Sequence, residues 1–250
     1  MASVLAKVAA SLSTPLEQRL LAEYGAIFVT TATPPPAVMF VDGAEVEAFQ
    51  SSLPVARSFF GEHEITLQAE ALEALTVAAS DLARAGGSIT ARAADAGGRS
   101  YEDTVTLWRR NVTRGLEHWE RLGRVAPERA QSIRELATAE QTTAILNLED
   151  TEQLYFGTFF DKSILYSVAA PGASQHLSLL AFDVAEYQDE TVVQVLGKRG
   201  WYRTVQNDLP HFTYLGHAED ALPNLGLKRI VRGYQDRVYC FWTPDLDRGE

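Results

Sequence analysis

The sequence predicts an α+β fold, in which helices pack on one side of a small antiparallel sheet. Two observations lead to this expectation. Apolar residues recur at three- and four-residue spacings through residues 66–145, which is the period of amphipathic helices. Beyond residue 160, short apolar segments are separated by turns, which is typical of strands. Because helices and strands are segregated and do not alternate along the chain, we expect α+β and not a doubly wound sheet.

The first sixty residues are expected to form an N-terminal appendage to a main domain over residues 61–250. A chain of 250 residues with 46% apolar residues is long enough for one core domain and such an addition. Asp42-Gly43 is a turn signal, and Pro34-Pro35-Pro36 is a stiff connector. The elements expected in the appendage are a helix over 15–24, strands over 26–30 and 37–41, and a short helix over 44–49.

The main domain is expected to begin with long helices. Leu67, Leu75 and their neighbours predict a helix over 66–85 that ends at Gly86-Gly87, and a second helix follows over 101–122. Pro127 marks the start of a third helix that runs to about residue 145. The remaining expected elements are a short strand over 88–91, strands near 164–169, 179–184, 201–205 and 212–215, and a helix over 190–198.

The composition excludes several classes of protein. With 22 Lys+Arg against 33 Asp+Glu, the net charge is −11, and no basic patch is present, so a nucleic-acid partner is not expected. No run approaches the ~20 apolar residues of a membrane span. The single cysteine, Cys240, excludes an internal disulfide and a cysteine-rich zinc site, and its aromatic surroundings indicate a buried thiol. Oligomeric state is left open.

Two segments of the second half carry the candidate chemistry. His176 is followed seven residues later by Asp183, which lies in an apolar run where an unpaired carboxylate would be costly. His211 opens a strand-like segment, three residues after Asp208. Two histidines and one aspartate are the protein ligands of an open catalytic zinc site, and a nearby carboxylate is a candidate general base. The spacing alone also allows a purely structural interpretation, a core histidine and an aspartate paired with arginine.

The other three histidines are expected to be surface or half-buried residues without a chemical role. His63 lies between two glutamates in an expected loop, His118 lies on the helix over 101–122, and His217 follows Gly216. His217 is kept as an outside candidate for a supporting role.

Three motifs together resemble a known family. Ser174-x-His176-x6-Asp183, followed by Pro210-His211-Phe212-x-Tyr214-Leu215-Gly216, is similar to the zinc motifs of D-alanyl-D-alanine carboxypeptidases of the VanY type, peptidase family M15. Gly98-Arg99-Ser100-Tyr101 stands where that family has an arginine in a turn that opens a helix. The resemblance covers roughly residues 88–216 and implies the small zinc-binding sheet of the LAS/hedgehog-like peptidase fold.

The resemblance implies zinc (Zn²⁺) bound by His176, Asp183 and His211. Arg99 would bind the terminal carboxylate of the substrate or polarise the scissile carbonyl, with Arg92 as the alternative, and Ser174 would contact the substrate or the zinc ligands.

The implied activity is hydrolysis of D-Ala-D-Ala-type peptidoglycan stem peptides, with Asp208 as the general base in place of the family's longer glutamate. That substitution keeps a second hypothesis open, a catalytically inactive zinc-containing cell-wall-binding module. A third is an unrelated function. The resemblance places the protein in the cell envelope or periplasm, but the first residues show no export signal, so a cytoplasmic location stays possible.

Overall fold

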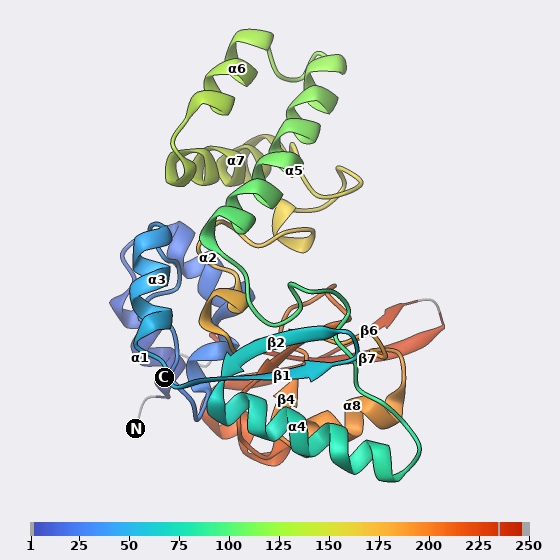
Figure 1. Ribbon diagram of the computed structural model, residues 1–250. Helices are drawn as coiled ribbons and strands as arrows, with labels where there is room; N and C mark the ends of the chain where they lie inside the picture. Colours follow the sequence, from blue (N-terminus) through green and yellow to red (C-terminus); the bar gives the residue numbers. More distant parts are fainter. Residues whose placement is uncertain (1–2, 235, 247–250) are drawn as a thin grey trace.

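A computed structural model describes residues 3–234 and 236–246 and shows a mixed α and β fold with small antiparallel sheets (Figure 1). The predicted α+β class is therefore confirmed. Helices α5 (Tyr101–Arg121), α6 (Pro127–Glu135) and α7 (Thr138–Glu152) form the helical part drawn at the top of Figure 1, and the sheets lie below it.

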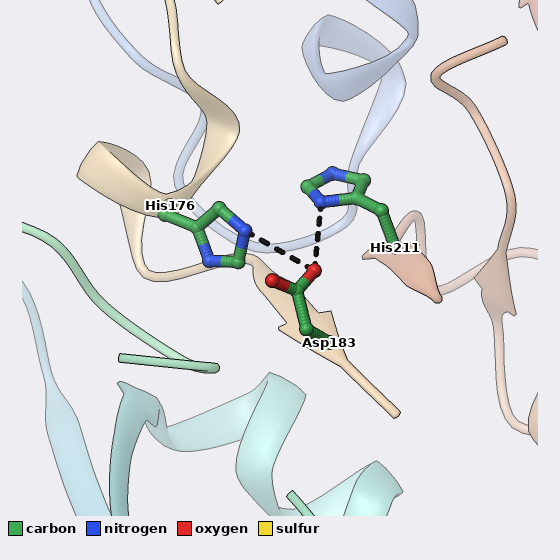
Figure 2. A group of neighbouring side chains, drawn as sticks. All are labelled: His176, Asp183 and His211. Atoms are coloured by element: carbon green, nitrogen blue, oxygen red, sulfur yellow. Dashed lines mark hydrogen bonds and ion pairs between the residues drawn. The ribbon is translucent and has the colours of Figure 1, made fainter. Parts of the chain in front are cut away.

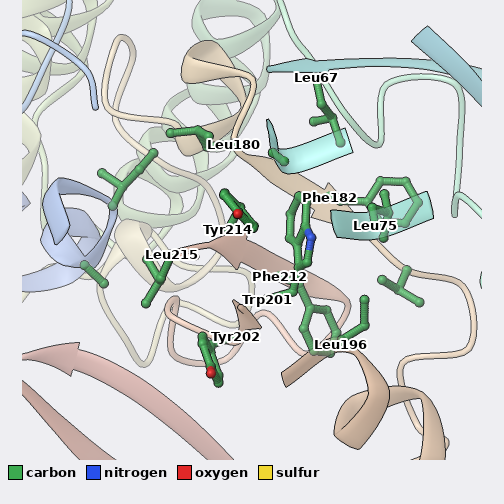
Figure 3. Close-up of a cluster of buried hydrophobic side chains, with 14 of the residues drawn as sticks. Leu67, Leu75, Leu180, Phe182, Leu196, Trp201, Tyr202, Phe212, Tyr214 and Leu215 are labelled. Carbon is green, nitrogen blue, oxygen red and sulfur yellow. The ribbon is translucent and has the colours of Figure 1, made fainter. Parts of the chain in front are cut away.

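The central sheet has three antiparallel strands in the order β3 (Ala181–Asp183), β5 (His211–Tyr214) and β4 (Trp201–Tyr202). Helices α4 (Ala69–Arg84) and α8 (Glu190–Gly197) pack against it. Their contact is a core of large buried side chains, in which Phe182, Trp201 and Phe212 meet leucines of the two helices (Figure 3). Burial of this apolar surface is the main stabilising contribution to the sheet that carries the site.

Two β hairpins flank this sheet, and neither is among the predicted elements. The first joins β1 (Val55–Phe60) to β2 (His63–Gln68), and the second joins β6 (Leu227–Tyr234) to β7 (Arg237–Pro244). Gly61 turns the first hairpin with φ of 69°, a left-handed conformation that glycine adopts readily. His63 therefore lies in a strand, and the helix expected from residue 66 begins only at Ala69.

Several short expected strands are wrong. The apolar run near residue 27 forms a buried 3-10 helix, η1 (Gly25–Val29), and residues 164–166 form another, η2 (Ile164–Tyr166). Residues 37–41 have no regular structure, and the expected strand over 88–91 contributes one isolated bridge to Val184. Short apolar runs have no period that separates a strand from a buried helical turn.

Helices α2 (Pro15–Tyr24) and α3 (Gly43–Ser51) follow the expected helices over 15–24 and 44–49, and α8 follows the one expected over 190–198. Helix α1 (Val4–Ser11) and the 3-10 helices η3 (Gln175–Ser178) and η4 (Glu219–Leu225) are not among the expected elements. The helix expected over 127–145 is divided, because Leu136 takes an extended conformation between α6 and α7.

The expected domain boundary at residue 60 falls in the turn between β1 and β2. Residues before it belong to the same cores as residues after it: Leu5 and Ile27 share a buried cluster with Phe182, and Leu20 shares another with Trp108. The first sixty residues are thus packed into the body of the molecule. Among the described residues, no helix combines the length and the apolar character needed to cross a membrane.

The buried carboxylate of Glu149 links helix α7 of the helical part to helix α2. Glu149 of α7 accepts hydrogen bonds from Arg19 of α2 at 3.2 Å, from the Ser163 hydroxyl at 2.6 Å, and from the backbone N–H groups of Phe156 and Ile164 at 3.0 and 2.7 Å. A buried charge is tolerated where it is paired and hydrogen-bonded in this way.

Candidate metal centre

The structure brings His176, Asp183 and His211 together (Figure 2). His176 lies on η3, while Asp183 and His211 are directly opposite residues of the paired strands β3 and β5. His176 Nε2 lies 3.4 Å and His211 Nδ1 lies 3.2 Å from the same oxygen, Asp183 Oδ1. One side-chain atom from each of the three residues lies within 4.8 Å of the other two.

A neighbouring glutamine determines which nitrogen of His211 carries the proton. The Gln175 amide donates to the Tyr24 carbonyl at 2.8 Å, and because a carbonyl only accepts, Gln175 Oε1 must face the other way. That oxygen lies 2.8 Å from His211 Nε2 and also accepts from the Thr213 hydroxyl at 2.5 Å. In neutral His211, Nε2 therefore carries the hydrogen and Nδ1 presents its lone pair toward Asp183.

His176 is oriented by a backbone carbonyl. Its Nδ1 lies 3.4 Å from the Gly97 oxygen, which can only accept, so the hydrogen of neutral His176 belongs on Nδ1. The other nitrogen, Nε2, is buried and has no hydrogen-bond partner among the described residues. A buried polar atom without a partner is uncommon in native proteins and calls for an explanation such as an ion.

The three atoms that converge are thus two imidazole lone pairs and a carboxylate oxygen. They repel one another unless a cation or a proton lies between them. Two ligand atoms ~2.0–2.1 Å from a tetrahedral ion are ~3.3 Å apart, close to the two distances to Asp183 Oδ1. In each histidine, the nitrogen that faces away from Asp183 contacts an oxygen acceptor, Gln175 Oε1 or the Gly97 carbonyl. Such an acceptor is usual for a metal-binding histidine. The buried group can therefore hold a metal ion.

The ionisation of the group suits the same role. Burial lowers the pKa of His176, although Asp183 acts in the opposite direction, so the neutral imidazole is favoured. Burial acts to raise the pKa of Asp183, but the charge and hydrogen bonds that His176 and His211 supply when protonated outweigh it and hold the pKa well below its ordinary value. Metal binding requires neutral imidazole and ionised carboxylate, and a cation between the three side chains would replace those protons.

Arg99 holds the other side of Asp183. Its Nη2 donates to Asp183 Oδ2 at 3.0 Å and its Nε to Asp95 Oδ2 at 3.0 Å. Asp183 Oδ1 is therefore left to face the two imidazoles, while its backbone N–H donates to the Ala96 carbonyl at 2.9 Å. Arg99 positions the Asp183 carboxylate through this contact and also lines the cleft.

The group lies at the wall of a cleft with a volume of about 410 Å³. His176, His211 and Ser174 line it, and α5 contributes Arg110 and Asn111. Arg110 is exposed and forms no ion pair with any residue in the described ranges. It is a second cation, besides Arg99, that can meet an anionic group in the cleft.

Asp208 lies on a tight turn at the edge of the same cleft. Asn207, before it, has a φ of 69°, and the Asp208 carbonyl accepts from the backbone N–H of His211 at 3.3 Å. The side chain of Asp208 is exposed and lines both this cleft and a second cavity. Its carboxylate is therefore available to a molecule bound beside His211.

A buried arginine supports this turn. Arg203 Nε donates to the Leu209 carbonyl at 2.8 Å, and its Nη2 donates to the Tyr187 carbonyl. Its guanidinium carbon lies 4.9 Å from the Phe212 ring centroid and 5.2 Å from that of Tyr239, a cation–π sandwich. Burial lowers the pKa of Arg203 to about 10, so it remains charged at neutral pH.

The other predicted candidates lie elsewhere. Arg92 lines the second cavity and not the cleft beside the metal-binding group. His217 Nε2 lies 2.8 Å from the Val29 carbonyl, a structural contact, and His118 stacks on Phe160 at a centroid distance of 4.1 Å. Cys240 is half-buried and free.

Sequence reasoning missed Gln175, Arg203 and Arg110. Gln175 stands next to His176, so its position in the motif was a usable signal. Arg203 and Arg110 carry no local signal, since their roles depend on segments that meet only in the folded chain.

Comparisons with models of known protein families, with curated proteins and with solved structures found no match to this chain.

Proposed function

We propose that the protein is a zinc-dependent hydrolase of peptides that end in D-Ala-D-Ala, the type found in peptidoglycan stem peptides. The observation that carries the proposal is the convergence of His176 Nε2, His211 Nδ1 and Asp183 Oδ1 at the wall of an open cleft. Two histidines and a carboxylate leave a coordination position free, as in catalytic zinc sites. The choice of substrate rests on the motif resemblance of residues 88–216.

A zinc ion bound by these residues would supply an activated water and an electrophile for the scissile carbonyl. Asp208, whose carboxylate lines the same cleft, would take a proton from the attacking water and return it to the leaving amine. Arg99 and Arg110 are the cations that line the cleft, and either can bind a terminal carboxylate or the developing oxyanion. Ser174 lines the same cleft and offers a hydroxyl to the bound peptide.

The proposal is tested first by metal content. Purified protein is expected to hold one zinc ion per chain by elemental mass spectrometry, and His176→Ala is expected to lose it. Iron in place of zinc, or zinc content that His176→Ala leaves unchanged, contradicts the proposal.

Activity is tested by release of D-alanine from an acetylated peptide that ends in D-Ala-D-Ala. Asp208→Ala is expected to lower kcat by about 10²–10⁴-fold while zinc stays bound, the usual contribution of a general base. Asp208→Glu is expected to retain activity, because it keeps the carboxylate. Zinc and peptide binding without any release of D-alanine would instead support the inactive cell-wall-binding module.

A further inference from the structure

A second cavity adjoins the cleft on the far side of Asp208. Its volume is about 680 Å³, and it shares six lining residues with the cleft, among them Asp208, Asn207 and Gln206, so the two adjoin along these residues. It lies between the loop over 157–167 and the β6–β7 hairpin, which extends outward from the sheets (Figure 1). Each part is within the ~300–1,000 Å³ typical of a small-ligand site, so together they fit a longer ligand.

Three cations line this second cavity. The Arg92 guanidinium carbon lies 5.7 Å from the Tyr187 ring centroid, and Arg232 Nη2 donates to Gln206 Oε1, a neutral acceptor, at 3.2 Å. Lys162 lies on the opposite loop. Across residues 3–234 and 236–246, none of these three side chains forms an ion pair.

Aromatic side chains surround these cations. Phe159 is 82% exposed and Tyr234 is 58% exposed, and they line the cavity from the loop and from the hairpin respectively. Tyr187, Tyr239 and Phe241 form more buried parts of the wall. Large exposed aromatics are unfavourable in water and often mark a binding surface when they line a depression.

The charge of the cavity is opposite to that of the whole chain. The chain carries a net charge of −11, whereas the cavity has three cations, Arg92, Lys162 and Arg232, against two carboxylates, Asp161 and Asp208. Because a depression with low-dielectric walls focuses the field of its charges, this arrangement attracts an anion. Guanidinium groups that lack a carboxylate partner bind an incoming carboxylate well.

We infer that the second cavity is a subsite for a carboxylate-bearing residue of the peptide substrate, upstream of the bond that is cleaved beside His211. The inference rests on the proposed function for the direction of the chain. A substrate that crosses Asp208 places its reacting amide at the metal-binding group and an acidic side chain between Arg92 and Arg232. The protein is then selective for acidic peptides longer than a dipeptide.

The test compares binding of two peptides to zinc-loaded protein by isothermal titration calorimetry. Both are acetylated and end in D-Ala-D-Ala with the last amide reduced to CH₂–NH, so that neither is hydrolysed. One carries glutamate and the other glutamine, two or three residues before the reduced bond. We expect the glutamate peptide to bind about fivefold more tightly, the scale of exposed charge pairs, and the preference to shrink in 0.5 M NaCl.

The double variant R92Q/R232Q is expected to reduce this preference to within about 1.5-fold. The matched control R57Q/R109Q removes two exposed arginines that line neither depression, and it should keep the preference. Equal affinities in the unaltered protein, or a preference that survives R92Q/R232Q, overturns the inference.

Release of D-alanine from the corresponding ordinary peptides is measured in parallel. A glutamate preference in binding without release of D-alanine rejects the proposed hydrolysis but supports the subsite. Release of D-alanine without any glutamate preference in binding supports the proposed hydrolysis but rejects the subsite. The two hypotheses therefore fail in distinguishable ways.

Discussion

Replacing Gln175 with leucine is expected to weaken metal binding although Gln175 does not touch the ion. Its Oε1 is the acceptor that keeps the hydrogen of His211 on Nε2 and leaves Nδ1 free for the metal. Leucine removes that acceptor, so the His211 ring can rotate or change tautomer. Loss of such a partner of a metal-binding histidine typically costs 10–100-fold in metal affinity, about 1.4–2.8 kcal/mol.

The same change is expected to destabilise the fold. It leaves the Tyr24 carbonyl, the Thr213 hydroxyl and His211 Nε2 without the partner that Gln175 supplies. At about 1 kcal/mol for each buried group, the low end of the usual range, the loss is about 3 kcal/mol. For a chain of this size, that corresponds to a fall in Tm of about 6–12 °C.

Zinc affinity is measured by competition with a chromophoric chelator, and Tm by calorimetry with saturating metal. Gln141→Leu is the matched control, because Gln141 is also buried and donates to the Ile133 carbonyl at 3.0 Å, but it lies in the helical part. The control should lower Tm and leave zinc affinity unchanged. Gln175→Glu keeps an acceptor for His211 and should recover most of the affinity. A folded Gln175→Leu protein that holds zinc within twofold of the unaltered chain would refute the reasoning.

Three further predictions concern other parts of the molecule. Because burial lowers the pKa of His176, protons compete less with metal at that imidazole, so zinc affinity measured by chelator competition should fall no more than about tenfold between pH 7.5 and 6.5, the effect of one competing proton; a steeper fall contradicts the shift. Glu149→Gln loses acceptor capacity for its four donors and should lower Tm by about 5 °C without changing zinc content, whereas an unchanged Tm would show that these bonds contribute little. Arg203→Leu leaves the Leu209 and Tyr187 carbonyls without their donor and should lower kcat for D-alanine release more than it changes zinc affinity; equal losses would mean that it acts on the metal-binding group.

The helices that start with a clear capping signal could be predicted closely. The helix expected over 101–122 is observed over Tyr101–Arg121, because Ser100 and Asp103 form a capping box and the apolar face is continuous. The hairpin of β1 and β2 was missed for the opposite reason. Its residues alternate only weakly between exposed and buried, and its short turn at Gly61 leaves no long polar segment to mark it.

The candidate site was likewise predicted only in part from the sequence. The family resemblance of the motifs implied that His176, Asp183 and His211 belong together, whereas their spacing alone left a structural interpretation open; the β3–β5 register places Asp183 and His211 opposite each other. Spacing could not show that Gln175 orients His211, because that contact depends on where the Tyr24 carbonyl lies in the folded chain. Sequence patterns also could not predict the second cavity, because its walls come from a loop near residue 160 and from a hairpin some seventy residues later.

The segment between α4 and α5, residues 85–100, connects the His176, Asp183 and His211 group to α5, which also lines the cleft. The Ala96 and Gly97 carbonyls contact Asp183 and His176, and three residues after Gly97, Ser100 caps the helix that carries Arg110, another residue of the cleft lining. Gly97 has no room for a side chain, since a Cβ there would lie 2.4 Å from Ile65 Cγ2. A displacement of this segment would therefore shift both the His176, Asp183 and His211 group and the start of α5, so the distance from the group to Arg110 depends on a single stretch of backbone.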